Sequence, residues 1–239
     1  MHQEPDPAAR LLWGPPPKAG RGPKAALSLD RIARAGIEIA DAEGLGALSM
    51  QRVAGLLDYT KMALYRYVPG KAELVALMVD AAIGAAPPVD GTGWRDPLAD
   101  WSRRLAAVFR RHPWLLDATV GPRLVGPAEL SWMERAVAAL ADTTLTGAER
   151  LDVVAVLAGH VRAIAQQSRA AGPEGSPEQQ LLVTLGSLIA THQDRYPATA
   201  AAMADSGSGG QDQALEFGLR CFLDGLGVLI GGRGPGVQP

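Results

Sequence analysis

The stretch LSMQRVAGLLDYTKMALYRYVPGKAEL, residues 48–74, contains two short helical patterns separated by a turn. Ser49 is placed to cap the first helix, and apolar residues then recur at i, i+3, i+4 and i+7, which indicates one buried face. Thr60 is placed to cap the second helix, and Pro69 must end it because proline does not fit a helix interior. Two short helices joined by a tight turn are typical of the helix-turn-helix motif, whose second helix lies in the DNA major groove.

The outward side of the second helix has the chemistry of a DNA-reading surface. On a helix that starts at Lys61, the side chains facing away from the apolar side are Lys61, Met62, Tyr65 and Arg66. Basic side chains can bond guanine, methionine can meet a thymine methyl group, and a tyrosine hydroxyl can bond a phosphate. Lys71 opens the next helix beside free backbone N–H groups, which favour an anion. On spacing alone, these cations could equally belong to an ordinary solvated face.

Two further helices complete a predicted N-terminal domain over residues 28–84. Ser28 is placed to cap a first helix that Gly44 closes, and a fourth helix is expected to end near Ile83. Residues 1–27 are rich in proline, glycine and alanine and lack periodic apolar residues. They are therefore expected to form a mobile arm.

The residues from Leu27 to about Leu77 resemble the DNA-binding domain of the TetR family of transcriptional repressors. The resemblance is carried by ARAGIEIADAEGLGALSMQRVAGLL, TKMALYRYV and GKAEL. It implies DNA contacts by nine residues: phosphate contacts by Thr60, Tyr65 and Lys71, base-edge contacts by Lys61, Met62 and Arg66, a place at the groove wall for Tyr67, and contacts with bases and phosphates by Gln51 and Arg52. One departure is Asp58, at a turn position where the family usually has glycine. Aspartate tolerates left-handed backbone better than most residues, so the turn can survive.

Residues 94–232 are expected to form a second domain, which the resemblance implies is all-helical. The elements RRHPWLL and GPAELSWMERAVAALA resemble the C-terminal domain of the branch closest to the tetracycline repressor. Ligand pockets are typically apolar with a few polar groups. Seven residues of this domain combine apolar and polar side chains in this way and would line an effector pocket if the helices that carry them come together: Trp101, Leu105, Phe109, Trp132, Met133, His160 and Gln167. These residues are also compatible with plain core packing, and His160 with a satisfied core histidine.

Two later helices carry apolar residues at alternating steps of three and four, the spacing of a heptad seam. Two such helices from each of two copies would close a four-helix bundle about a two-fold axis, with Gly218 and Gly225 allowing close approach. Nine residues are predicted to form this dimer interface: Val154, Leu157, Val161 and Ile164 in one helix and Leu215, Leu219, Phe222, Leu226 and Leu229 in the other. Alternatively, both seams pack inside one subunit. A dimer is favoured because a helix-turn-helix protein needs two recognition helices about 34–36 Å apart.

Composition and charge narrow the class of protein. The 239 residues are 47% hydrophobic and 20% charged, which is ordinary globular composition. The net charge is −2 overall but +3 over residues 1–71, so the N-terminal part is the one suited to a polyanion. No apolar run approaches the ~18 residues of a membrane span, and no signal peptide is expected. The single cysteine, Cys221, fits a reducing cytoplasm.

The sequence does not predict an enzyme. His112, His160 and His192 have no second ligand at i+3 or i+4, so no metal site is expected, and the sequence lacks phosphate-loop and dinucleotide fingerprints, so no cofactor is expected. The predicted fold is all-α, with an N-terminal three-helix helix-turn-helix DNA-binding domain joined to an α-helical ligand-binding and dimerisation domain. Residues 233–239 are expected to form a disordered tail.

Together, the residues and the resemblance predict a cytoplasmic, homodimeric transcriptional regulator. It would repress by binding a palindromic operator in double-stranded DNA. A small hydrophobic effector would release it, because an effector acts by preferring one conformation. Two alternatives stay open: an all-α small-molecule-binding enzyme, and a regulator without a small-molecule ligand.

Overall fold

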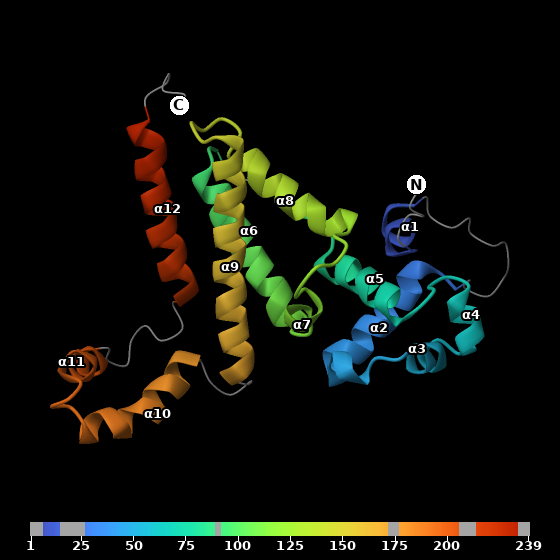
Figure 1. Ribbon diagram of the computed structural model, residues 1–239, viewed down its shortest axis with the longest axis horizontal. Helices are drawn as coiled ribbons and strands as arrows, with labels where there is room; N and C mark the ends of the chain where they lie inside the picture. The colour runs from blue at the N-terminus through green and yellow to red at the C-terminus, as the bar shows by residue number, and fades with distance from the viewer. Residues whose placement is uncertain (1–6, 15–26, 89–91, 172–176, 206–213, 234–239) are drawn as a thin grey trace. The chain divides into compact units, whose positions relative to one another are not determined.

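The computed structural model describes residues 7–14, 27–88, 92–171, 177–205 and 214–233. All the regular elements in these residues are helices, which confirms the predicted all-α fold class (Figure 1). The chain divides into two compact units, Met1–Asp142 and Thr143–Pro239.

The first unit contains the predicted helix-turn-helix elements. They are α2 (Leu29–Glu43), the 3-10 turn η1 (Leu45–Ala47), α3 (Met50–Leu56), α4 (Lys61–Tyr65) and α5 (Lys71–Ile83). The three predicted caps are confirmed, because the side-chain oxygens of Ser28, Ser49 and Thr60 accept hydrogen bonds from backbone N–H groups three residues later. Asp58 adopts a left-handed φ of 60° between α3 and α4, so the turn forms without the usual glycine.

A shared apolar core holds these short helices together. Its fully buried side chains include Ile32, Val53, Leu64, Val68 and Met78. A Cβ atom at Gly36 would lie 2.5 Å from the Met78 sulfur, so the missing side chain lets α2 approach α5. Helices shorter than about 12–15 residues are marginal alone in water, so α3 and α4 depend on this core for their positions.

Residues 7–13 form a helix that the sequence did not predict. α1 (Pro7–Trp13) packs against α5, and the Trp13 Nε1–H donates to the Val125 backbone oxygen at 3.1 Å. The expected mobile arm over residues 1–27 is therefore wrong for this segment, and most of the rest of the arm lies outside the described residues. Seven residues are too few to show a helical period, and the surface on which they pack is distant in the sequence.

Three further helices, α6 (Arg95–Arg111), α7 (Leu115–Ala118) and α8 (Pro127–Ala139), complete the first unit. α8 packs against both α5 and α6. The helix-turn-helix elements and α6–α8 thus share one compact unit, which ends at Asp142 rather than between the predicted domains. Proline and glycine near residues 85–93 mark a break between helices, but they do not show which helices pack across that break.

The second unit contains α9 (Gly147–Ala171), α10 (Pro177–Thr191), α11 (Pro197–Asp205) and α12 (Ala214–Gly232). α9 packs against α12, and a Cβ atom at Gly218 would lie 2.3 Å from the His160 ring, so this glycine makes room for a ring of its own chain. Arg233 donates to Glu149 at 2.7 and 2.8 Å, and this bond is the main reason that the pKa of Glu149 falls to about 2. The predicted disordered tail is therefore wrong for Arg233, and its other residues lie outside the described ones.

Candidate nucleic-acid interface

α4 turns one side into the core and the other to solvent. Leu64 is fully buried, whereas Met62 is 71% exposed and Tyr65 is 38% exposed. Lys61 and Arg66 are exposed as well, and neither forms a salt bridge with a described residue. The Lys61 Nζ lies 5.5 Å from the centre of the Tyr65 ring, a cation–π distance. The structure therefore gathers two cations, a methionine and a tyrosine on the outward side of this short helix.

Arg52 of α3 is held by an ion pair that the sequence did not reveal. Its guanidinium donates to both carboxylate oxygens of Glu43, at the end of α2, and to the Ala47 backbone oxygen at 3.3 Å. The hydrogen bond from Arg52 lowers the pKa of Glu43, so this carboxylate is charged at neutral pH. The pair joins α2 to the start of α3, next to the exposed Gln51.

The remaining predicted DNA contacts lie at helix starts and in the turn after α4. Thr60 is exposed and caps α4, while Tyr67 is half-buried. Lys71 is exposed at the first position of α5 and forms no salt bridge with a described residue. Gly70 precedes it with extended backbone and no side-chain cap, and the Glu73 carboxylate lies at the same helix start, 2.8 Å from the position of a Cβ atom at Gly70.

Trp101 and Trp132 of the predicted effector pocket have the environment of packed core. They are 3% and 5% exposed, and their rings meet edge to face at 6.1 Å. The Trp101 Nε1–H donates to the Trp132 backbone oxygen and the Trp132 Nε1–H to the Gly84 backbone oxygen, both at 2.9 Å. Both indole N–H groups are therefore bonded within the chain. Phe109 is also buried, and Leu105 is half-buried.

The other three predicted effector contacts lie on two helices. Met133 is 46% exposed on α8. In α9 of the second unit, the His160 Nε2 lies 3.2 Å from the Leu215 backbone oxygen, as expected for a satisfied structural histidine, and Gln167 is exposed. An effector pocket built from these residues stays a prediction.

The two predicted dimer seams are largely buried within the chain itself. In α9, Leu157 and Val161 are 1% and 0% exposed, and in α12, Leu219 and Leu226 are 1% and 6% exposed. A side chain that is already buried offers almost no surface to a second copy, so these four residues pack inside one subunit, which was the alternative reading of the seams. The other five members are less uniform: Val154 is buried, Ile164, Leu215 and Phe222 are half-buried, and Leu229 is exposed.

The opposite face of α12 carries exposed apolar side chains next to the charged Arg220 and Asp224. Phe217 is 60% exposed, Val228 is 77% exposed, and Cys221 is exposed between them. Steps of four and seven residues place these side chains on one side of the helix, away from the buried Leu219. We call Phe217, Cys221 and Val228 the α12 stripe. The heptad pattern did not single it out, because that pattern follows the buried side.

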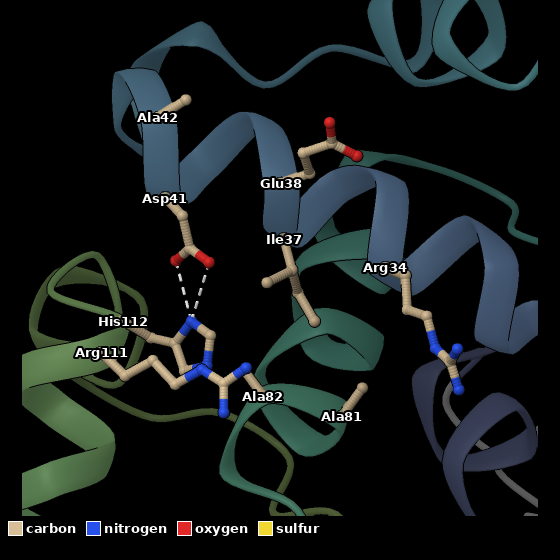
Figure 2. Close-up of a pocket in the computed structure, with 9 residues that line it drawn as sticks. All are labelled: Arg34, Ile37, Glu38, Asp41, Ala42, Ala81, Ala82, Arg111 and His112. Atoms are coloured by element: carbon tan, nitrogen blue, oxygen red, sulfur yellow. Dashed lines mark hydrogen bonds and ion pairs between the residues drawn. The ribbon is translucent and has the colours of Figure 1, made fainter.

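Two carboxylates that the sequence did not single out join the helix-turn-helix elements to α6–α8. Asp41 of α2 faces His112 in a cleft of about 680 Å³ lined by α2, α5 and the end of α6, as Figure 2 shows. Asp80 of α5 accepts hydrogen bonds from backbone N–H groups at the start of α8. Nothing in the sequence around His112 and Trp114 indicates a partner on α2.

In the parts of the chain that the structure describes, no helix is both long and apolar enough to cross a bilayer. The same residues include no group of three or more His, Cys, Asp or Glu side chains placed to hold a metal ion.

Comparisons with known proteins cover nearly the whole chain. The sequence profile described as "Tetracyclin repressor-like, C-terminal domain" matches residues 87–230. The chain is 37% identical over 235 residues to the HTH-type transcriptional repressor DrrR1 of Streptomyces coeruleorubidus, covering 93% of this chain and 86% of that relative. It resembles the crystal structure of the Streptomyces coelicolor TetR family protein ActR in complex with actinorhodin, with a TM-score of 0.72 and 28% identity over 87% of this chain and 98% of ActR. The regulator SCO7222 of Streptomyces coelicolor shares the fold, with a TM-score of 0.74 at 22% identity over 86% of this chain and 100% of SCO7222.

Proposed function

The chain belongs to the TetR family of transcriptional regulators, and from that premise we propose that it is a repressor that binds a palindromic operator as a homodimer and leaves it when a small hydrophobic effector binds. The similar proteins are named as regulators and not as enzymes. We place its action in the cytoplasm, together with the operator DNA.

The observation that carries the DNA-binding part is the two-sided α4. Leu64 holds one side in the core, and Lys61, Met62, Tyr65 and Arg66 are exposed on the other. Lysine and arginine bond guanine edges, and methionine suits a thymine methyl group. We therefore assign base contacts to Lys61, Met62 and Arg66, and a phosphate contact to the Tyr65 hydroxyl.

The surroundings of α4 supply the proposed phosphate contacts. Thr60 and Lys71 lie at the starts of α4 and α5, where backbone N–H groups also favour an anion. We assign Gln51 and Arg52 of α3 to bases and phosphates beside α4, and Tyr67 to the groove wall. Arg52 is paired with Glu43 through both terminal nitrogens, so the assigned DNA contact requires its guanidinium to leave or share that carboxylate.

Lys71→Ala is expected to weaken binding to all duplexes nearly equally. It should also reduce the slope of log affinity against log salt concentration by about 1 per half-site, because one phosphate contact is lost. Arg66→Ala is the matched comparison, and it should change the preference at one base pair by about 1–3 kcal/mol. The measurement is fluorescence anisotropy at several salt concentrations, with duplexes that the wild-type protein selects from a random pool. If Lys71→Ala leaves affinity and slope unchanged, its assignment is wrong.

The homodimer is proposed to form through the α12 stripe rather than through the buried seams. Large apolar side chains exposed on one helix face can mark a protein–protein contact site, and here charged Arg220 and Asp224 flank them. The stripe lies on the side of α12 opposite to Leu219, which its own chain already buries. A stripe on one helix also suits a two-fold interface, in which each copy offers the same patch.

The effector is proposed to be aromatic and mostly apolar. ActR was solved in complex with actinorhodin, and that structure is similar to this chain over most of its length. The candidate contacts in the first unit are Leu105, Phe109 and Met133, while Trp101 and Trp132 would support them by packing. For His160 and Gln167 of the second unit, an effector contact stays the prediction made from the sequence.

Actinorhodin, used as a probe, is expected to release a labelled operator from the protein. Met133→Ala should raise the probe concentration needed for half release, because an exposed apolar contact is lost, and it should leave operator affinity without the probe unchanged. Anisotropy titration of the protein–operator complex measures both. Release by glucose 6-phosphate in place of the aromatic probe would contradict the proposed class of effector.

A further inference from the structure

One carboxylate of α2 binds two side chains that lie 71 and 73 residues later in the chain. Asp41 accepts from the His112 Nδ1–H at 2.8 Å through Oδ1 and 3.0 Å through Oδ2, and from the Trp114 Nε1–H at 2.7 Å through Oδ1. An ionised carboxylate can only accept, so the His112 Nδ1 carries the proton. Figure 2 shows the Asp41 side chain pointing from α2 to the His112 ring.

The two donors belong to a firmly packed part of the first unit. His112 is 7% exposed and Trp114 is 3% exposed, and their rings meet edge to face at 6.3 Å. α7 follows directly, with Leu115 and Leu116 buried at 0% and 2% exposure. The Asp41 carboxylate is therefore attached to a well-packed turn rather than to a loose surface loop.

α5 has a separate attachment to α8. The Asp80 Oδ1 accepts from the backbone N–H groups of Ala128 and Glu129, at 2.9 and 3.2 Å, and so caps the start of α8. A Cβ atom at Gly126 would lie 2.1 Å from the same oxygen, so glycine at this position makes the contact possible. This second attachment shares no residue with the first.

Two attachments on different helices prevent a rotation that one attachment would permit. α2 and α5 pack against each other, so α2–α5 (Leu29–Ile83), which we call the reading head, can move as one body. With α5 attached alone, the reading head could swing about the end of α5. The bonds of Asp41 from α2 to His112 and Trp114 block that swing, and α4 is held at one orientation relative to α6–α8.

We propose that Asp41 is a positioning residue that sets which spacing of operator half-sites the dimer accepts. The proposal rests on the proposed function, in which two reading heads bind one palindrome. Each added base pair moves a half-site by about 3.4 Å along the DNA and rotates it by roughly 35°. A reading head that can swing follows such a change, whereas a reading head fixed at two points does not.

The test uses the full-length protein and the operator that it selects from a random duplex pool. Duplexes with one or two base pairs inserted between the half-sites are compared with the selected spacing, and the ratio of affinities is the spacing discrimination. Asp41→Ala should reduce this discrimination by about fivefold or more, as is typical of couplings within a protein. Trp114→Phe, which removes the indole N–H donor and keeps an aromatic ring, should reduce the discrimination less. Asp41→Asn should restore most of it, because its Oδ1 can still accept from both donors.

Asp30→Ala is the matched control, since Asp30 lies on the same helix and bonds Arg34 of that helix at 3.1 Å. It should leave the spacing discrimination at the wild-type value. If Asp41→Ala merely destabilises the fold, affinity falls equally for all spacings and the ratio does not change, which would overturn the inference and leave the proposed function intact. A wild-type protein that selects no duplex would overturn both.

Discussion

Val228→Glu is expected to turn the protein into a monomer that no longer retains its operator. Val228 is 77% exposed in the α12 stripe, which also contains Phe217 at 60% exposure. A glutamate in an apolar interface would lose contact area and leave a charge without a partner, which typically costs several kcal/mol. A monomer binds one half-site at a time, so the operator affinity should fall by at least about 100-fold as the avidity of two linked heads is lost.

Sedimentation equilibrium measures the mass of the Val228→Glu protein, and anisotropy measures its operator affinity. Val120→Glu is the matched control, because Val120 is also exposed, at 67%, but belongs to the first unit rather than to α12. It should leave both the dimer and the operator affinity unchanged. Leu219→Glu should instead impair folding, since Leu219 is only 1% exposed within its own chain. A dimeric Val228→Glu protein with intact operator binding would refute the interface.

The helix-turn-helix elements could be predicted because their signals are local. Ser28, Ser49 and Thr60 each bond a backbone N–H group three residues away, so the cap and its partner stand together in the sequence. The turn at Asp58 is a second local signal. Left-handed backbone was expected at this position because the family usually has glycine there, and the observed φ of Asp58 is 60°. Interactions between residues a few positions apart in the sequence depend little on the rest of the fold.

The two faces of α12 show a limit of periodicity. A repeat of apolar residues indicates that a helix buries one side, but it does not say which molecule covers that side. Leu219 and Leu226 fit a heptad seam and are buried by their own chain, while the exposed Phe217 and Val228 stand outside the seam. Burial within one chain therefore accounts for most of the predicted seam residues, and the dimer interface itself stays a prediction.

The bonds that join the reading head to α6–α8 left no sign in the sequence. Asp41 and Asp80 have the spacing of ordinary solvated carboxylates on helices, and their partners follow 48 to 73 residues later. α1 was missed for a related reason, because its packing depends on α5, a helix far along the chain. Such contacts follow from the three-dimensional fold, so one sequence alone does not show them.

Leu64→Ala is expected to lower the free energy of unfolding by about 2–5 kcal/mol, the usual range for emptying a buried leucine site. Leu64 is 0% exposed in α4, which extends only from Lys61 to Tyr65. A helix this short has little stability of its own, so the loss should also loosen the surface proposed to read DNA.

Met62→Ala is the control: it removes a side chain of similar size from the same helix at a position that is 71% exposed. The unfolding free energy of this variant should stay within about 0.5 kcal/mol of the wild-type value. Urea unfolding followed by circular dichroism gives both values, and anisotropy with operators altered one base pair at a time should show a changed preference for Met62→Ala. If the two variants had equal stability, α4 would not have one buried and one exposed side, because the burial of Leu64 and the exposure of Met62 are the reason that their expected stabilities differ.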